Sequence, residues 1–555
     1  MAVITIDKKT FEKEIGNLDS EMQNKIAMFG TPVEAVDSNE LQLEVFPNRP
    51  DLLSYHGFRR AFLAFLGKKT GLKKYKINKP EKNYNVSIES SLKNVRPYTA
   101  CAIVKGLKLD DEKIKELIEI QEKLHITIGR KRKKVAIGIY PLEEIKLPIT
   151  FKAMEPDKIK FIPLEMNREI SGLEILQKHP TGREYSHLLA GKAKFPIFTD
   201  AENKILSMPP IINSQSTGKV NEKTKEVFVE CSGFDFETLK RCLNIIITSM
   251  AEMGGKIYQM NLNYGSKKET TPNLTPQNKK ISLEKTNKLL GLDLKEKDLK
   301  KLIERMGYNY NQKENSVEIP VWRTDILHEV DIIEDIAIAY GYENLIPEIP
   351  SISTTGEEDR KETMKRKISE ILSGLRMNEV SNYHISTKKD QVEKMEFSKQ
   401  EETIIVEASK TENDTLRKNL SSMLLKNLSE NIDSEYPQEI FEIGKVFYLK
   451  EGNVKEKNNL AAVVSPGNFT RINQILDYLS RMTSKKLTLK EPEKTEKTPP
   501  YFIEGRTAEI FLNEKNIGFI GEVHPKILKN WKIKMPVALF EIELEDILEE
   551  LTKKN

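Results

Sequence analysis

The chain is too long to fold around one hydrophobic core. It has 555 residues, whereas chains longer than about 250–300 residues usually divide into separate domains. Hydrophobic residues make up 38% of the sequence, which is enough to fill several cores. We therefore expect a multidomain protein of about three to five domains.

The charge balance and the cysteine content exclude several classes of protein. The 88 basic and 84 acidic residues give a net charge of only +4, which argues against a protein that coats nucleic acid indiscriminately. No apolar run reaches the ~18 residues of a membrane helix, and the first residues lack the apolar core of a signal peptide. Cys101, Cys231 and Cys242 form no C-x-x-C pair. We expect a cytosolic protein without a membrane partner, a disulfide framework or structural zinc.

One basic run stands out against this balance. A run of this kind forms either a solvated face or a phosphate-binding patch, and the sequence alone leaves both interpretations open. Its five members are Arg130, Lys131, Arg132, Lys133 and Lys134.

Changes in hydrophobic pattern divide the chain into four regions, and together they predict an α+β multidomain fold. A stretch dense in Lys, Glu and Pro near the C-terminus is expected to be an exposed loop, at 485–500. The four regions are an α+β domain at 1–85, a mixed domain at 86–265, a small helical module at 275–346 and an α/β domain at 360–555.

Four acidic residues have the most specific spacing in the sequence. Asp325 precedes a predicted helix, and Asp331, Glu334 and Asp335 share one arc of that helix at 3.6 residues per turn. Like charges at these spacings repel, and a hard divalent cation such as Mg²⁺ would offset the repulsion with oxygen ligands. Alternatively, Asp325 caps the helix and the other acids form a solvated face near its N-terminus.

The residues around these acids resemble a known family. Pro320–Ile326, Asp331–Ile336 and Tyr340–Tyr342 are similar to the winged-helix-like module of phenylalanyl-tRNA synthetase beta subunits. Further motifs occur in family order and cover nearly the whole chain, in the short archaeal and eukaryotic form. They are Asn48–Leu52, His179–Tyr185, Ser207–Ser214, Leu416–Leu420 and Phe441–Gly444.

The resemblance implies a fold, a cofactor and partners. The fold would combine winged-helix-like modules, a mixed α/β editing domain and a class II synthetase-like domain built on an antiparallel sheet. The partners would be phenylalanine tRNA and an alpha subunit, in an alpha2-beta2 heterotetramer, and the basic run at 130–134 would contact the tRNA. The family's Mg²⁺ ligands correspond to Asp325, Asp331, Glu334 and Asp335.

The C-terminal domain lacks the residues for amino-acid activation. In the class II fold, arginines bind the phosphate charge of ATP. The strand Phe441–Gly444 has no arginine before its glutamate, and no Gly-x-Gly-x-x-Arg string occurs near the C-terminus. We therefore expect no activating residues in this chain and place the activating site on the alpha subunit.

The middle domain is the better candidate for chemistry. An apolar pocket for phenylalanine rejects an added hydroxyl only about a hundredfold, so tyrosine is at times attached to the tRNA and must be hydrolysed. An editing pocket selects tyrosine by pairing its hydroxyl with polar groups. Glu230 and Ser232 are the candidate recognition residues, and Ser207 and Asn213 are candidate lining residues. The alternative is an ordered loop at 207–218 that bonds its own backbone.

Three functions fit this sequence. The first is a ligase subunit with a hydrolytic editing site. The second is a free-standing tRNA-binding or trans-editing protein, and the third is a non-enzymatic scaffold that kept the fold. Co-purification with an alpha subunit separates the first function from the others, and hydrolysis of tyrosyl-tRNA separates the second from the third.

Overall fold

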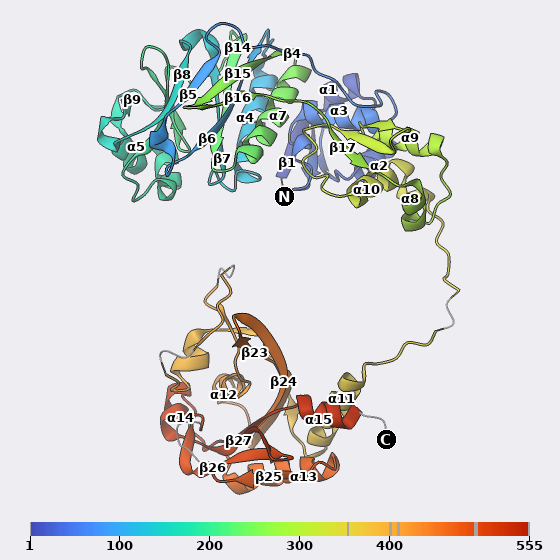
Figure 1. The fold of residues 1–555 in the computed structure, drawn as a ribbon, viewed down its shortest axis with the longest axis vertical. Helices are drawn as coiled ribbons and strands as arrows, with labels where there is room; N and C mark the ends of the chain where they lie inside the picture. Colours follow the sequence, from blue (N-terminus) through green and yellow to red (C-terminus); the bar gives the residue numbers. More distant parts are fainter. Residues whose placement is uncertain (1, 352–353, 399–401, 408–410, 493–497, 553–555) are drawn as a thin grey trace. The chain divides into compact units, whose positions relative to one another are not determined.

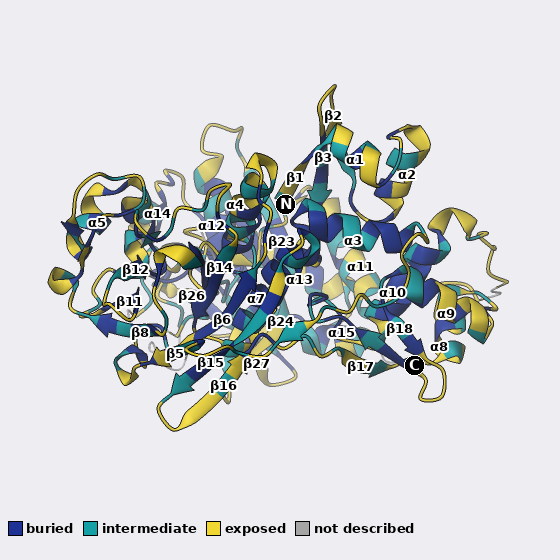
Figure 2. Ribbon diagram, turned by 90° about the horizontal axis from the view of Figure 1, so that it is seen from above, coloured by how far each residue is buried: buried dark blue, intermediate teal, exposed yellow. Residues whose placement is uncertain are grey.

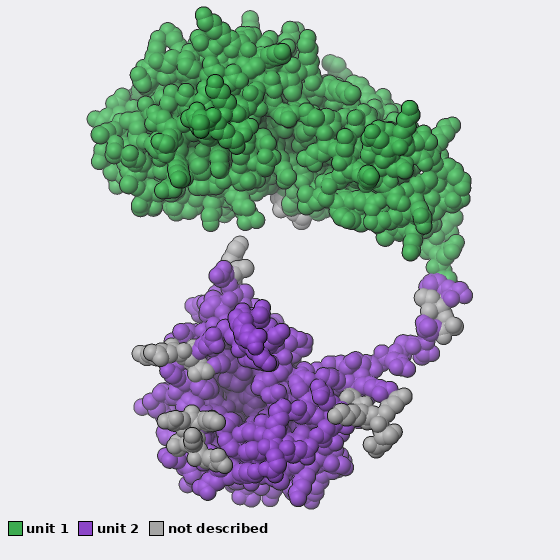
Figure 3. All heavy atoms as spheres, viewed as in Figure 1, with its two compact units in different colours: residues 1–349 green, residues 350–555 purple. Residues whose placement is uncertain are grey.

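The computed structural model describes residues 2–351, 354–398, 402–407, 411–492 and 498–552. These residues form two compact units, Met1–Ile349 and Pro350–Asn555, each with its own apolar cores (Figures 1 and 3). Mixed α/β architecture with several sheets is therefore confirmed, whereas the winged-helix-like and class II-like details stay predictions. No helix in the described ranges is both long and apolar enough to cross a membrane.

The N-terminal part of the first unit is a three-stranded sheet covered by helices. The alternating residues Leu41, Leu43 and Val45 are buried, as their period of two predicts. Phe58 and Phe62 stack with ring centroids 5.1 Å apart, and the Ser54 side chain caps their helix by accepting the Gly57 N–H. The elements are β1 (Ala2–Asp7), α1 (Lys8–Glu14), α2 (Ser20–Met28), β2 (Val33–Val36), β3 (Glu40–Val45), a 3-10 turn (Pro50–Leu52) and α3 (Tyr55–Phe65).

An 11-stranded sheet dominates the middle of the first unit. Strand β14 (Glu226–Gly233) runs antiparallel between β6 (Tyr98–Lys105) and β7 (Val135–Pro141). Helices α4 (Asp111–Ile126) and α7 (Phe236–Glu252) cover one face of these three strands, which are largely buried (Figure 2). The remaining elements are β4 (Ile77–Asn78), β5 (Asn85–Ile88), β8 (Ile149–Met154), β9 (Lys160–Phe161), β10 (Ile170–Ser171), α5 (Gly172–Lys178), α6 (Pro180–Tyr185), β11 (Phe195–Thr199), β12 (Ile205–Met208), β13 (Ile212–Asn213), β15 (Lys256–Tyr264) and β16 (Lys267–Thr271).

A small module of helices and a three-stranded sheet completes the first unit. Gly291 ends its first helix in the left-handed conformation at φ 67°, which glycine adopts without steric cost. Its apolar residues join the same core as the N-terminal helices and α7. The elements are β17 (Gln277–Lys280), α8 (Leu283–Leu290), α9 (Glu296–Arg305), β18 (Asn309–Asn311), β19 (Ser316–Ile319) and α10 (Glu329–Tyr340).

The second unit is a seven-stranded, mostly antiparallel sheet with helices on both faces. The exposed loop predicted at 485–500 is wrong in part, because residues 487–490 pair with β26 as a strand; residues 493–497 lie outside the described residues. The elements are α11 (Arg360–Gly374), β20 (Asn378–Glu379), β21 (Ile385–Ser386), a π-helical turn (Lys389–Glu393), β22 (Thr415–Leu416), α12 (Ser421–Glu430), β23 (Gln438–Lys450), β24 (Asn453–Ser465), α13 (Phe469–Met482), β25 (Leu487–Lys490), β26 (Phe502–Leu512), β27 (Lys515–Val523), α14 (Pro525–Trp531), β28 (Ala538–Glu543) and α15 (Glu545–Thr552).

A buried ion pair joins two of the sequence motifs in this unit. Arg417 Nη1 donates to Glu442 Oε1 at 2.6 Å, and the two side chains are only 1% and 2% exposed. Gly444 makes room for the pair, since a Cβ there would lie 2.3 Å from Arg417 Nη2. Asn382 Nδ2 donates to the other Glu442 oxygen at 2.8 Å. The motif arginine therefore serves the architecture of this unit.

We predict that Arg417→Met destabilises the second unit by about 3–5 kcal/mol, because it leaves Glu442 buried without its partner charge. Replacing both residues, in Arg417→Met/Glu442→Gln, should restore much of the loss. Denaturant unfolding followed by Trp531 fluorescence in a Trp322→Phe background measures both values. Equal destabilisation by the single and double variants would contradict the pairing.

Candidate functional site

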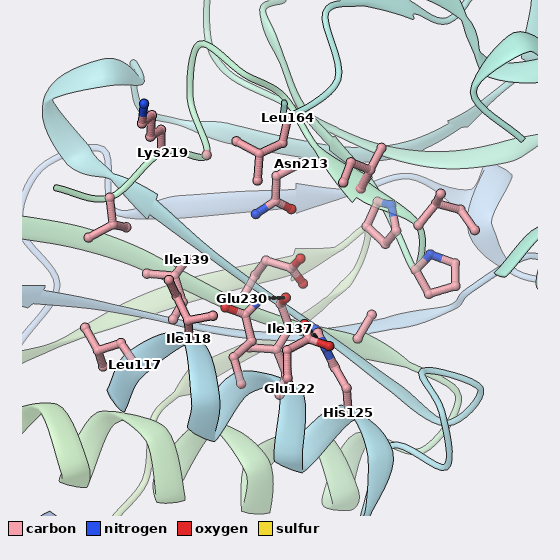
Figure 4. Close-up of a pocket in the computed structure, with 18 of the residues that line it drawn as sticks. Leu117, Ile118, Glu122, His125, Ile137, Ile139, Leu164, Asn213, Lys219 and Glu230 are labelled. Carbon is pink, nitrogen blue, oxygen red and sulfur yellow. Dashed lines mark hydrogen bonds and ion pairs between the residues drawn. The ribbon is translucent and has the colours of Figure 1, made fainter. Parts of the chain in front are cut away.

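A cavity of about 530 Å³ opens between helix α4, the segment around Pro209–Asn213 and strand β14. Figure 4 shows the Glu230 and Asn213 side chains pointing into the same space, above apolar residues of α4. Leu117 lines the floor of the cavity from α4, and Leu164 lies on its opposite side. The cavity thus combines apolar and polar lining residues, as small-molecule sites generally do.

Strand pairing places Glu230 in the cavity. It lies in a fully buried stretch of β14, directly opposite Gly138 of β7. A Cβ on Gly138 would lie 2.2 Å from the Tyr140 hydroxyl and 2.7 Å from Glu230 Oε1. This glycine within a strand therefore makes space for the polar groups of the site.

The Tyr140 hydroxyl connects three of the polar residues proposed from the sequence. It donates to Ser207 Oγ at 2.7 Å and lies 3.3 Å from Glu230 Oε1 and 3.4 Å from Asn213 Oδ1. Glu230 and Asn213 line the cavity itself, while Ser207 reaches it only through Tyr140. The structure therefore brings these three residues together. Tyr140 was missed, although a glycine two residues before it in the strand signalled a close approach.

Ser232 takes a different place from the other predicted editing residues. Its hydroxyl accepts a hydrogen bond from Arg96 Nε at 3.1 Å, and its carbonyl accepts from Arg96 Nη2. Arg96 and Ser232 are both buried, at 2% and 0% exposure. Ser232 is not among the described residues that line the cavity. It holds Arg96 beside the site.

The loop at 207–218 combines both interpretations drawn from the sequence. Thr217 Oγ1 donates to the Leu206 carbonyl, and the Gly218 N–H donates to the Ser214 carbonyl, so part of the loop bonds backbone. Ser207 and Asn213, by contrast, face Tyr140. The loop is thus ordered by its own backbone bonds and still supplies polar groups to the site.

Glu230 is the group with the strongest electrostatic perturbation in the cavity. Burial raises the pKa of its carboxyl to about 8, although the charge of Arg96 and the nearby hydroxyl groups of Tyr140 and Ser232 act to lower it. Its second oxygen, Oε2, is buried and has no hydrogen-bond partner among the described residues. A ligand hydroxyl in the cavity would satisfy that oxygen.

Glu122 of α4 is a second acidic residue of the cavity, and the sequence did not predict it. Arg132 Nη2 donates to Glu122 Oε1 at 2.8 Å, and its Nη1 donates to the Ile211 carbonyl at 2.9 Å. Burial acts to raise the pKa of Glu122, but the hydrogen bonds and charges of His125 and Arg132 hold it at about 2. Glu122 is therefore an ionised carboxylate.

The basic run divides between this cavity and the surface. Arg132 lines the cavity, whereas Lys133 lines a neighbouring hollow. Arg130, Lys131 and Lys134 are exposed. The first three residues of the run adopt positive φ angles, which turn the chain back toward β7.

The four acids of the predicted metal site are engaged separately. Arg323 Nη2 donates to Oδ2 of both Asp325 and Asp335, at 2.7 Å in each case. No group of three or more potential metal ligands occurs in the described part of the chain. As placed, these residues do not fit one cation shared by four carboxylates, since Arg323 already supplies the counter-charge for two of them.

The other two acids of this set lie at the start of α10. Asp331 Oδ2 accepts the backbone N–H groups of Leu327 and His328, each at 2.7 Å, so Asp331 stabilises the N-terminus of the helix. Asp325 pairs with Arg323 rather than capping the helix, which begins after His328. Glu334 is exposed.

Comparison with known proteins gives the family. The models of the phenylalanyl tRNA synthetase beta chain CLM domain and of the tRNA synthetase B5 domain match residues 346–544 and 279–342. The phenylalanine–tRNA ligase beta subunit of Thermococcus sibiricus is 40% identical over 504 residues, 90% of this chain and 89% of the relative. That of Archaeoglobus fulgidus is 36% identical and covers 98% of each chain.

A solved structure supports the same assignment for the first unit. The crystal structure of an N-terminal fragment of the phenylalanyl-tRNA synthetase beta-subunit from Pyrococcus horikoshii is 38% identical, with a TM-score of 0.59. It covers 61% of this chain, and 99% of the fragment is matched. The chain belongs to the family of phenylalanine–tRNA ligase beta subunits. The resemblance seen in the sequence is confirmed, and the ligase subunit is favoured over the free-standing and scaffold alternatives.

The perturbed carboxyl of Glu230 makes stability depend on pH. Its pKa is about 8 in the folded protein against 4.5 for the unperturbed group, so the folded state binds one more proton between these values. The stabilising contribution is fully present below about pH 4.5 and is lost as the pH rises toward about 8. We predict that Glu230→Gln reduces the fall in Tm between about pH 5 and pH 9.

Differential scanning fluorimetry across this pH range measures the effect. Glu226→Gln, on the same strand but outside the cavity, is the matched control and should follow the wild-type profile. Superimposable profiles for wild type and Glu230→Gln would show that Glu230 titrates normally.

Proposed function

We propose that this chain is the editing, non-activating subunit of a phenylalanine–tRNA ligase. With an alpha subunit and ATP, the assembled enzyme attaches phenylalanine to its tRNA. The cavity at Glu230 then hydrolyses tyrosyl-tRNA formed in error. The observation that carries the editing role is the buried carboxyl of Glu230, a residue that lines the cavity and whose Oε2 lacks a hydrogen-bond partner among the described residues.

The cavity selects tyrosine through its hydroxyl group. The aromatic ring of the substrate packs against apolar residues of α4, such as Leu117, and its hydroxyl meets Glu230 Oε2. Phenylalanine would leave that oxygen buried and unpaired, and an unsatisfied polar group costs about 1–3 kcal/mol. The cavity therefore favours tyrosine over phenylalanine, whereas the activating site on the alpha subunit favours phenylalanine over tyrosine.

Hydrolysis needs a water molecule at the ester carbonyl. The water oxygen bonds to the carbonyl carbon, the bond from that carbon to the terminal ribose oxygen of the tRNA breaks, and a proton of the water passes to the ribose oxygen, which releases tyrosine and free tRNA. The side chains of Asn213 and Glu230 position the substrate for this step. His179 is less suited to it, because its Nε2 bonds the Leu164 carbonyl at 3.0 Å.

The role of Arg417 in the second unit supports an activating site on an alpha subunit. Arg417 pairs with Glu442 inside the unit, so it does not face a nucleotide. The activating chemistry therefore belongs to the alpha subunit, and the expected assembly is an alpha2-beta2 heterotetramer. Phenylalanine tRNA is the macromolecular substrate of both sites, and the run Arg130–Lys134 contacts it.

Magnesium would bind this chain at the start of α10. Mg²⁺ often takes only one or two carboxylates and completes its shell with water. Oδ1 of Asp331 and the exposed carboxylate of Glu334, three residues apart on one helix, fit that smaller set. Asp325 and Asp335 would not bind the ion directly, because both are paired with Arg323.

We predict that millimolar MgCl₂ raises the Tm of the wild-type chain and that Asp331→Ala/Glu334→Ala abolishes this rise. The double variant also loses its cap on α10, so the quantity to compare is the increment in Tm caused by Mg²⁺. Calorimetry with and without MgCl₂ measures it. An equal increment in both proteins would place any Mg²⁺ elsewhere.

Editing is tested directly by Glu230→Ala. We predict that this variant slows deacylation of tyrosyl-tRNA by about ten- to a hundredfold, because the tyrosine hydroxyl loses its buried partner. Phenylalanyl-tRNA formation by the assembled enzyme should stay nearly unchanged. Both rates are measured with the alpha subunit present.

Glu226→Ala is the matched control for this experiment and should edit at the wild-type rate. Equal editing by wild type and Glu230→Ala would remove Glu230 from the site. A parallel loss of editing and aminoacylation would show that the substitution damaged the fold instead.

A further inference from the structure

A second hollow, of about 410 Å³, adjoins the editing cavity. Of the described residues that line it, three carry a cationic side chain and none is acidic. We call it the cationic cavity. It is lined by Val95, Arg96, Lys133, His187, Leu188, Leu189, Lys192, Pro196, Pro210 and Phe234.

An exposed aromatic ring forms part of this cavity. Phe234 directly follows strand β14 and is 48% exposed, whereas most large apolar side chains of this region are buried. The Arg96 guanidinium and the Lys192 ammonium each lie 5.5 Å from the centroid of its ring. An exposed ring between cations is the arrangement that binds single-stranded nucleic acid, in which bases stack on the ring and phosphates meet the positive charges.

Three observations show that the two cavities are neighbours. Pro210 lines both of them. Arg132 lines the editing cavity, and its neighbour Lys133 lines the cationic cavity. Arg96, in the wall of the cationic cavity, donates to Ser232, two residues after Glu230 on the same strand. When the amino acid attached to the tRNA lies beside Glu230, the nucleotides next to it therefore reach the cationic cavity.

We propose that the cationic cavity binds the single-stranded 3′ end of the tRNA. A base near the 3′ end stacks on Phe234, and Lys133 and Lys192 neutralise the adjacent phosphates. This inference rests on the proposed editing function, since it names how the substrate of that site is held. Base stacking and charge act without sequence readout, which suits the CCA end shared by all tRNAs.

The chemistry of the walls favours RNA over the other occupants. A free amino acid would need a partner for its carboxylate and one for its ammonium group, and the lining residues described here offer no carboxylate for the latter. An apolar peptide would leave three cations facing its surface. A strand of alternating bases and phosphates matches the ring and the charges together.

The test compares Phe234→Leu, Phe234→Tyr and Lys133→Met/Lys192→Met with wild type in the assembled enzyme. Phe234→Leu should raise the KM for tyrosyl-tRNA deacylation about tenfold or more, with kcat nearly unchanged. Phe234→Tyr retains a stacking surface and should keep the wild-type KM. Phe46→Leu, at another exposed phenylalanine, and Lys146→Met, at another exposed lysine, are the matched controls.

A second readout does not depend on catalysis. Binding of a fluorescein-labelled single-stranded RNA ending in CCA is measured by anisotropy at several salt concentrations. Each lost phosphate contact should reduce the slope of log affinity against log salt by about 0.7. The lysine double variant should therefore show a shallower slope, and Phe234→Leu should bind about tenfold more weakly at every salt concentration.

The outcomes separate the two proposals. If wild type deacylates tyrosyl-tRNA but Phe234→Leu and the lysine variant keep its KM and its RNA affinity, the cationic cavity does not hold the 3′ end. If wild type fails to deacylate yet the variants weaken RNA binding as expected, the editing function fails and the RNA site stands. A rise in KM for Phe234→Tyr equal to that for Phe234→Leu would also overturn stacking.

Discussion

Helix α7 and strand β14 hold the first unit together, because both are buried over most of their length. A helix with buried residues on several faces is positioned by the core around it. In α7 the buried residues run without interruption from Cys242 to Met250. The sheet covers one side of the helix and α3 covers another, with a hydroxyl hydrogen bond of 2.6 Å between Ser54 and Ser249. The position of β14, and with it the direction of Glu230, is therefore set by packing across several parts of the chain.

The same dense packing buries the Glu230 carboxyl and leaves its hydrogen bonding incomplete among the described residues. Removing a carboxyl from water without pairing both of its oxygens destabilises a protein, and buried polar atoms without partners are rare enough to require an explanation. Tyr140 satisfies one oxygen in part, while Oε2 has no partner among the described residues. Groups perturbed in this way gather at functional sites, where a ligand completes the hydrogen bonding. In the proposed editing function, the hydroxyl of the substrate is the hydrogen-bond partner that Oε2 lacks.

Local patterns predicted the elements but only part of the site. The helices at 283–290 and 296–305 were predictable because their apolar spacing and their terminal glycines act within a few residues. Asn213 was found in a family motif, and Glu230 was proposed as the polar group that would pair with a tyrosine hydroxyl. Their contact through Tyr140 depends on β14 lying between β6 and β7, which is a property of sheet order that no local period encodes. Ser232 shares the strand of Glu230, and Arg96, 136 residues away in sequence, donates a hydrogen bond to its hydroxyl, a contact that no local pattern encodes.

Buried arginine–carboxylate pairs occur in the motifs that stabilise the fold, whereas Glu230 has no such pair among the described residues. A buried pair offsets the desolvation of both ions, and the loss of one partner destabilises the fold. Such motif residues therefore report family membership and architecture. In the cavity at Glu230, by contrast, Arg96 acts on Glu230 through its charge but directs its hydrogen bonds to Ser232. Glu230, the carboxyl proposed to recognise the substrate, has no arginine as a hydrogen-bond partner among the described residues. The structural pairs are Arg49–Asp51, Arg323–Asp325 and Arg417–Glu442.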